Sequence, residues 1–600
     1  MIVYRKQERT INPKQELACM AGMLGGLTAG SSAHHDQAVE LLIEYGELES
    51  GITDALCPDA DFDSHVTRLL RRAGVLSGHI FKTAWEGRTD ETGNWTGKMS
   101  AAFQELAASD LPGAVCVRVP EGYAHYGLYP ETYLEAAMEF LNAEHPEGIA
   151  CIGARSIGTS LSSVVCAALE ASGLTVVSYT VRPRGHPFYR GLVLSTGFEQ
   201  ELCSLKCSHF IVVDEGPGLS GSSICCVAQK LSELGIADSR IVLFPSWNPD
   251  GSNFISESAR RQWQRHRKYT VSFEKAWLSK GQLKRDLPYG GLLDISAGAW
   301  RPLFSGDVSA YPAIHPYHEQ RKYLCSEDIP RAVLAIKGGE AIGPAAAAER
   351  PAALFVKFAG LGRYGRAKYE RALKLAYDGF CPLVSGFAKG FLTTHVVYGR
   401  PLTNSGVNAK MLDAFACYLD YVRKTFPVEQ EIRFDEIVMM IERNILVGLG
   451  GKWPGRLSFL ENFRPLVSGS SAVAIDGRMM PHEWLSAGRG YMKMDSVDHH
   501  ADQFFPGCQD IAWDMAGTII EFALDREEQA YLLQKYRSFG DRGNMQERLP
   551  FYLIAYLAYR MGYATFAANE LGTSPDGRKF RALAKRYSTL LCGEVLRFSG

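Results

Sequence analysis

The sequence predicts an α/β protein built in two parts. Four short apolar runs between residues 148 and 244 alternate with segments that suit helices, which is the spacing of parallel strands joined by crossover helices. This predicts a doubly wound parallel sheet, preceded by a helical N-terminal cap. From residue 353 on, three apolar runs come before a series of long helical segments, and this order predicts an α+β domain with two lobes.

The predicted boundaries divide the chain into four regions. Residues 1–110 form the helical cap, because the apolar side chains of segments such as 34–50 fall on one helical face. Residues 111–250 form the sheet domain, 251–330 a linker or small subdomain, and 331–600 the second domain with a helical C-lobe.

Composition indicates a globular protein of the cytoplasm. The chain has 600 residues, of which 46% are hydrophobic and 22% charged, enough for two or three domains with large cores. A formal net charge of −2 favours neither a nucleic-acid nor a membrane-binding surface. The 14 cysteines include no Cys-x-x-Cys pair, which suits reduced thiols. The start, MIVYRKQERT, lacks the apolar core of a signal peptide. We expect small-molecule substrates as partners and leave a homodimer open.

The most informative stretch follows the third apolar run of the sheet domain. The run 209–213 reads as a buried strand, and the carboxylates of Asp214 and Glu215 end it. A loop rich in glycine and serine, 216–223, then leads into a helix. Free backbone N–H groups and the helix dipole favour a phosphate at such a place, and serine hydroxyls add donors. The alternative is a core strand that ends in an ordinary polar turn.

A second loop of this kind follows the first strand of the predicted sheet. The strand 148–152 leads into a loop that contains Arg155, Ser156 and Gly158, and a helix begins after it. Ligands of open parallel sheets bind at the carboxyl ends of the strands. The two loops should therefore face one crevice.

Together these residues resemble the phosphoribosyl-pyrophosphate (PRPP) site of type I phosphoribosyltransferases, over about residues 110–250. The resemblance implies Mg²⁺ as cofactor, PRPP as substrate, and transfer of the phosphoribosyl group to an unidentified base or related acceptor with release of pyrophosphate. The cap would then be a separate lobe or the hood that holds the acceptor. The PRPP-binding residues that the resemblance implies are Arg155, Ser156, Gly158, Asp214, Glu215, Ser220, Gly221, Ser222 and Ser223.

A basic loop lies where that family has a flexible lid. Residues 181–190 read VRPRGHPFYR and contain Arg182, Arg184, His186 and Arg190. Such groups suit the charge that develops on a leaving pyrophosphate. The resemblance therefore implies a catalytic role for them, and a solvated basic turn is the alternative.

The second domain carries a lysine inside an apolar strand. Lys357 lies in the run LFVKF, and a charge in such a run needs a partner; Glu370 on the next helix is the expected one. Over about 330–530 the pattern resembles the aminoglycoside-phosphotransferase branch of the protein-kinase-like fold. The resemblance implies that Lys357 and Glu370 bind nucleotide, with ATP as a further ligand, and that Asp495 holds a metal.

The catalytic loop departs from that family. Aligned on Pro481, Arg478 stands where the family has its catalytic aspartate, and Glu483 stands in place of an asparagine and becomes a second metal ligand. Three interpretations stay open: Asp476 is the base, the lobe binds nucleotide without transferring phosphate, or it is only a scaffold. Asp510 and Asp514 match aspartates that brace the loop. Residues 498–502 read DHHAD and are interpreted as a polar active-site loop rather than a metal cluster.

The sequence thus predicts phosphoribosyl transfer joined to a nucleotide-binding, kinase-like lobe. Two other classes of function remain open. One is a PRPP or nucleotide sensor without catalysis, and the other is a defence or stress effector that consumes nucleotides.

Overall fold

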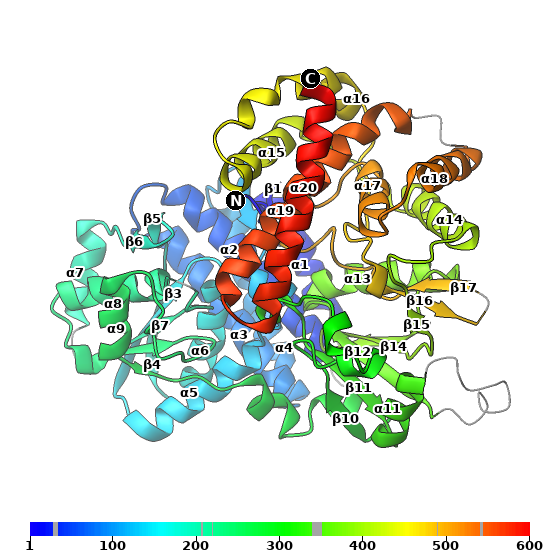
Figure 1. The fold of residues 1–600 in the computed structure, drawn as a ribbon. Helices are drawn as coiled ribbons and strands as arrows, with labels where there is room; N and C mark the ends of the chain where they lie inside the picture. The colour runs from blue at the N-terminus through cyan, green and yellow to red at the C-terminus, as the bar shows by residue number, and fades with distance from the viewer. Residues whose placement is uncertain are drawn as a thin grey trace.

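The computed structural model describes residues 1–27, 34–205, 208–218, 220–338, 351–488, 490–540 and 544–599. In Figure 1 the first part of the chain, blue to cyan-green, lies beside the second part, which runs from green to red. The long C-terminal helices, in red, cross the middle of this view. Among the described residues, no helix combines the length and the apolarity that crossing a bilayer needs.

The N-terminal region is helical and packs on the sheet domain. Its elements are β1 (Glu8–Ile11), α1 (Pro13–Gly26), α2 (His34–Leu56), α3 (His65–Trp85), η1 (Thr89–Glu91) and α4 (Thr92–Ala108). The predicted strand near 114–119 is β2 (Val115–Arg118), which pairs antiparallel with β1. Helices α2 and α3 rest on α6 (Ile157–Ala171), where a Cβ at Gly78 would lie 2.2 Å from the backbone oxygen of Ser163. The region is therefore a layer over the sheet domain.

The predicted parallel sheet is present. Its order is β4-β3-β7-β8-β9, and each neighbouring pair is parallel. The strands are β3 (Gly148–Ala154), β4 (Thr175–Val181), β7 (His209–Val213), β8 (Ile241–Phe244) and β9 (Arg267–Lys268). The chain moves outward from β3 in both directions, so the crevice between β3 and β7 is the topological switch point. The helices around the sheet are α5 (Pro130–Glu144), α6, α7 (Thr196–Ser204), α8 (Ser222–Glu233) and α9 (Glu257–Arg265).

One antiparallel sheet takes strands from both sides of the domain boundary predicted at residue 331. Strands β10 (Gly291–Asp294) and β11 (Lys322–Ser326) belong to the antiparallel sheet of the second part, whose order is β10-β11-β12-β14-β13. Its other strands are β12 (Ala353–Phe358), β13 (Val384–Ala388) and β14 (Phe391–His395). The short elements before and within this region are η3 (Asp238–Arg240), η4 (Glu274–Leu278), η5 (Leu283–Asp286), α10 (Arg301–Phe304), η6 (Val308–Ala310), η7 (Pro316–His318) and α11 (Ile329–Gly338).

Helices dominate the rest of the second part and share one large core. Helix α13 (Gly362–Tyr377) packs on the antiparallel sheet, and β15 (Arg400–Pro401), β16 (Trp484–Ala487) and β17 (Gly490–Lys493) form a small sheet. The remaining helical elements are α14 (Ala409–Thr425), α15 (Phe434–Leu449), η9 (Pro454–Arg456), η10 (Ser458–Phe463), α16 (Arg464–Ser468), η11 (Pro481–Glu483), α17 (Ala512–Glu521), α18 (Arg526–Ser538), α19 (Met545–Leu571) and α20 (Pro575–Ser599).

A short turn is one of the contacts between the two parts, beside ion pairs such as Lys389–Asp36 and a shared hydrophobic core. The π-helical turn η2 (Gly122–Tyr126) follows β2, and its backbone oxygens bond to the second part. Leu361 N donates to the oxygen of Tyr123 over 2.9 Å, and Lys368 Nζ donates to that of Ala124 over 3.2 Å. Gln503 Nε2 donates to the Tyr126 hydroxyl over 3.0 Å. These bonds fix the carboxyl edge of the parallel sheet against the second part.

Candidate functional sites

The acidic pair lies at the carboxyl end of β7, at the switch point of the parallel sheet. The Tyr133 hydroxyl donates to the backbone oxygen of Asp214 over 2.7 Å, and this bond holds the end of the strand. Gly122 lies so close to Glu215 that an added Cβ would be 2.7 Å from Oε1. The turn η2 and the acidic pair are thus in direct contact.

Within the described residues, neither carboxylate of this pair forms an ion pair. Burial raises the pKa of Asp214 to about 6. It raises the pKa of Glu215 to about 8, and the charges of Glu121 and Asp214 add to the rise. Two half-buried acids without an ion-pair partner cost stability. Such groups in a crevice mark a candidate binding site.

The serine loop lies next to the pair, but its hydroxyls are already engaged. Gly221 has a φ of +61° and caps α8, where Phe254 leaves no room for a Cβ. The hydroxyls of Ser220 and Ser222 donate to the backbone oxygen of Pro187 over 2.9 and 2.6 Å. Ser223 lies in the first turn of α8.

Pro187 is at the tip of the basic loop, which is a hairpin of β5 (Arg184–His186) and β6 (Tyr189–Gly191). The hairpin therefore rests on the serine loop. Phe188 N donates to the exposed His186 Nδ1 over 3.2 Å, so His186 helps shape the tip.

The arginines of the hairpin region do not all face the crevice. Arg182 pairs with Asp54, and Arg184 Nη1 lies 3.1 Å from Asp61 Oδ2. These contacts do not support the expectation that both meet pyrophosphate, because acids of the N-terminal region already neutralise them. Arg190 donates to the oxygen of Pro183 over 3.1 Å, and its charge acts to lower the pKa of Asp214. The charge of Arg182 acts in the same direction.

Arg155 also differs from its expected role. Its side chain has 0% exposed surface, and its Nε lies 2.7 Å from Asp54 Oδ1. A buried guanidinium cannot reach a ligand in the crevice, so this residue braces the fold. The neighbouring backbone stays well placed: Ser156 has a φ of +126°, and a Cβ at Gly158 would lie 2.6 Å from the oxygen of Val213. Gly158 thus lets the start of α6 approach the end of β7.

In the second part, Lys357 has acidic partners, but Glu370 is not one of them. Lys357 Nζ lies 2.6 Å from Asp495 Oδ1 and 2.9 Å from Asp498 Oδ2. The expected pairing with Glu370 is wrong, because Glu370 is on the exposed face of α13. The buried charged residues of that helix are Lys368 and Arg371, and Arg371 Nε donates to the oxygen of Ser496 over 2.8 Å.

Asp476 is closed off from solvent, which argues against its role as a base. Its side chain has 0% exposed surface and lies 3.1 Å from Lys493 Nζ, and the Tyr418 hydroxyl donates to it over 2.6 Å. Burial acts to raise the pKa of Asp476, but Lys493 and His499 outweigh burial and the pKa lies below its usual value. Asp514 accepts the N–H groups of Asp476 and Gly477, each over 2.7 Å, so this residue does brace the loop.

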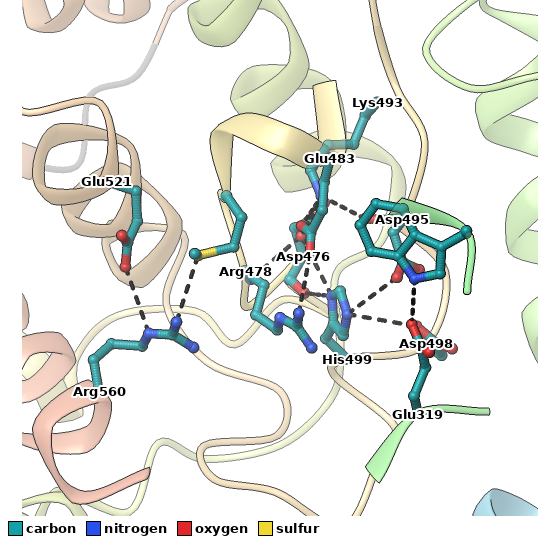
Figure 2. A network of polar contacts seen from close by, with 12 residues as sticks. Glu319, Asp476, Arg478, Glu483, Lys493, Asp495, Asp498, His499, Glu521 and Arg560 are labelled. Carbon is teal, nitrogen blue, oxygen red and sulfur yellow. Dashed lines mark hydrogen bonds and ion pairs between the residues drawn. The ribbon is translucent and has the colours of Figure 1, made fainter. Parts of the chain in front are cut away.

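The two predicted metal ligands come together, and a histidine joins them. Ligand atoms of Glu483, Asp495 and His499 lie within 4.8 Å of one another. Figure 2 shows His499 between Asp476, Asp495 and Asp498. Buried Asp498 Oδ1 has no hydrogen-bond partner, which fits a cation, whereas Glu483 Oε1 lies 3.0 Å from Arg478 Nη2. Carboxylate oxygens suit Mg²⁺. His499 was not among the predicted metal ligands, because its motif DHHAD was interpreted as a polar active-site loop.

A cavity of about 880 Å³ opens beside this cluster. Its walls come from the turn η2, the segment 295–322, strands β12 and β14, the loop 476–499, and helices α19 and α20. Lys357 and Asp495 are on one wall. The helices α19 and α20 and the segment 295–322 carried no signal of a site in the sequence. They approach one another through Arg301 Nη1, which lies 2.8 Å from Asp576 Oδ1.

No family model matches the chain, and no curated protein matches it. Solved structures resemble part of it. Choline kinase LicA from Streptococcus pneumoniae is 15% identical with a TM-score of 0.33, covering 53% of this chain and 98% of its own. Macrolide 2'-phosphotransferase MphH from Brachybacterium faecium is 11% identical with a TM-score of 0.32, covering 52% and 97%. Spectinomycin phosphotransferase APH(9)-Ia, solved with ADP and spectinomycin, is 10% identical with a TM-score of 0.31, covering 52% and 92%. Likeness this distant supports no assignment of activity to this chain.

Proposed function

We propose that the second part binds a nucleoside triphosphate or diphosphate with Mg²⁺ in the 880 Å³ cavity. The observation that carries this is the position of Lys357 on the cavity wall, between Asp495 and Asp498 and beside the Glu483–Asp495–His499 cluster. A lysine is a common point-charge contact for phosphate. The cluster would hold the metal, which supplies further positive charge for the phosphate oxygens.

We infer binding without phosphate transfer to a hydroxyl group. Such transfer needs a base within hydrogen-bond reach of the acceptor. Arg478 stands where the resemblance expects the base, and an arginine side chain stays protonated. The nearby Asp476 carboxylate has no exposed surface and is held by Lys493. Neither group can accept a proton from a bound hydroxyl.

The test measures ATP–Mg²⁺ binding to the full chain by calorimetry. Lys357→Met and Asp495→Asn should each weaken binding by about 1–3 kcal/mol, the range for loss of a charged hydrogen bond. Lys389→Met is the matched control, because Lys389 is also a partly buried lysine paired with an acid, Asp36, over 3.1 Å. It does not line the cavity. The proposal fails if ATP does not bind, or if all three variants behave alike.

A second function, in the first part, rests on a different observation. Asp214 and Glu215 are half-buried at the switch point, beside the starts of α6 and α8, and neither forms an ion pair with a described residue. We propose that this crevice binds PRPP and transfers its phosphoribosyl group, with release of pyrophosphate. The two carboxylates would accept the ribose hydroxyls, and the loop 216–223 would hold the 5'-phosphate. The hairpin tip must first leave Ser220 and Ser222.

Two measurements test this second function. PRPP with Mg²⁺ should raise the unfolding temperature, and a panel of bases should show which acceptor releases pyrophosphate. The double variant Asp214→Asn, Glu215→Gln should lose both effects. The control is Asp250→Asn with Glu257→Gln, a pair of exposed acids on the same domain. Stabilisation without pyrophosphate release would favour a sensor over an enzyme, and no stabilisation would exclude the PRPP site.

A further inference from the structure

The cavity has a second charged wall, which is richer in arginine than the wall that carries Lys357, Asp495 and Asp498. The loop 476–483 and helices α19 and α20 contribute Arg478, Arg560, Lys579 and Arg586 to its lining. We propose that this arginine wall, defined as Arg478, Arg560 and Arg586, binds the phosphate group of a second small molecule, a phosphomonoester. The proposal extends the nucleotide site and can be tested apart from it.

Arg478 and Arg560 converge on the same loop from different elements. Arg560 is on α19, and its Nη2 donates to Met480 Sδ over 3.5 Å. Arg478 is two residues before Met480, and its Nη2 lies 3.0 Å from Glu483 Oε1. Figure 2 shows both arginine side chains beside this loop. The two positive charges oppose each other, since each neighbouring cation disfavours the other.

The carboxylates near this wall are too few to neutralise it. Glu521 is buried and serves two arginines, with Arg560 Nε at 3.5 Å and Arg586 Nη1 at 3.4 Å. The Tyr587 and Tyr556 hydroxyls also donate to it, over 2.8 and 2.9 Å. Glu483 is likewise shared, between Arg478 and Lys493. Because Asp476 also pairs with Lys493, the three arginines of the wall share two carboxylates, Glu483 and Glu521, which leaves one positive charge in excess.

Guanidinium N–H groups without a hydrogen-bond partner also favour an anionic ligand at this wall. The Nε atom of Arg478 is buried and makes no hydrogen bond. Arg560 Nε also makes none, although it lies 3.5 Å from Glu521 Oε1. The Arg560 side chain is only 7% exposed, so it is poorly placed to be satisfied by bulk water. Guanidinium groups bind phosphate oxygens through paired N–H donors. A phosphomonoester carries nearly two negative charges at neutral pH, which suits a wall where three arginines share two carboxylates.

The position of Arg478 bears on the charge of the second ligand. Arg478 stands where the resemblance to the kinase-like fold expects the base, and an arginine side chain stays positively charged. An arginine at this position favours an anionic ligand over a neutral alcohol. The cavity would therefore hold a nucleotide at Lys357 and an already phosphorylated molecule at the arginine wall.

The experiment titrates the full chain with sn-glycerol 3-phosphate, a probe that lacks a ribose ring. Arg478→Gln should weaken its binding at least tenfold, and Arg586→Gln should weaken it to a smaller extent. The matched control is Arg464→Gln: Arg464 and Arg478 side chains are each 41% exposed and each pairs with a carboxylate. Arg464 is not among the residues that line the cavity.

The Lys357→Met variant separates this inference from the nucleotide proposal. It should keep its affinity for glycerol 3-phosphate while its affinity for ATP falls. If Lys357→Met loses both ligands, the probe occupies the nucleotide site and the arginine wall is not a separate site. If Arg478→Gln binds the probe as the wild type does, the arginines only brace the fold. If the wild type does not bind the probe at all, the inference is also overturned.

Discussion

Two pairs of carboxylates in this protein have different electrostatic surroundings. Asp476 and Glu483 share the ammonium group of Lys493, whose side chain has 0% exposed surface. Asp214 and Glu215 are half-buried, form no ion pair with a described residue and have raised pKa values. The first arrangement stabilises an internal loop, because its charges are paired. The second arrangement lowers the free energy of unfolding, and this cost marks the pair as a candidate ligand-binding site.

The raised pKa values predict how pH changes the stability. Asp214 moves from 3.8 to about 6, and Glu215 moves from 4.5 to about 8. Between about pH 4 and pH 8 the native state therefore binds more protons than the unfolded state, so this pair lowers the stability as pH rises. Asp214→Asn with Glu215→Gln should thus stabilise the free protein at pH 8 by more than about 1 kcal/mol, since one pKa unit corresponds to about 1.4 kcal/mol.

The measurement compares denaturant unfolding of the wild type and the double variant at pH 5 and pH 8. The gap in the free energy of unfolding should widen at the higher pH. A gap that stays constant, or a variant that is less stable at pH 8, would contradict the assignment. The exposed pair Asp250→Asn, Glu257→Gln serves as the control and should show little change.

At the scale of elements, the hairpin β5–β6 connects the N-terminal region to the serine loop. Asp61 follows α2 and is 1% exposed. It accepts the backbone N–H of Arg182 over 2.7 Å and pairs with the side chains of Arg155 and Arg184. At the other end of the hairpin, Pro187 accepts from Ser220 and Ser222. The hairpin is therefore anchored at its base and covers the loop with its tip.

Asp61→Asn should loosen this hairpin. Removing the charge leaves two arginines without their shared partner, and breaking buried pairs of this kind costs about 3–5 kcal/mol. Hydrogen exchange of the backbone amides at 182–191 should become faster. Asp59→Asn is the control, because Asp59 is exposed two residues away. Equal exchange rates in both variants would show that Asp61 does not hold the hairpin.

At the scale of the whole molecule, the turn η2 lies between the two candidate sites. Gly122 contacts Glu215 at the acidic pair, while His125 and Tyr126 line the large cavity. The N-terminus also crosses to the second part: Gln7 Oε1 lies 2.9 Å from His125 Nε2, and Gln7 Nε2 donates to the oxygen of Asp502 over 2.8 Å. The turn η2 thus contacts both the acidic pair and the large cavity.

We predict that ADP with Mg²⁺ slows hydrogen exchange in η2 and in residues 1–7. The reason is that a ligand that binds only the folded cavity suppresses opening of the segments that line or brace it. Helix α9, at the far side of the parallel sheet, is the internal control and should keep its exchange rate. Protection confined to β12 and the loop 476–499 would mean that the two sites are independent.

The strands and several site residues could be predicted from the sequence. The run 209–213 and the run 353–358 match β7 and β12, because a short apolar stretch bounded by turn residues has few other ways to bury itself. The adjacency of the two Gly/Ser loops followed from one rule on parallel sheets. Glu483 and Asp495 came together as expected, since both flank the short strands β16 and β17.

Only the tertiary structure decided which charges pair. The partners of Lys357 are Asp495 and Asp498, more than 100 residues away along the chain, whereas local spacing pointed to Glu370. Arg155, Arg182 and Arg184 are neutralised by Asp54 and Asp61, from a region that the sequence presented only as a helical cap. The antiparallel sheet likewise takes β10 and β11 from the stretch predicted to be a linker. Sequence patterns report how a segment buries its own apolar face, while ion pairs and cavity walls depend on which segments meet in space.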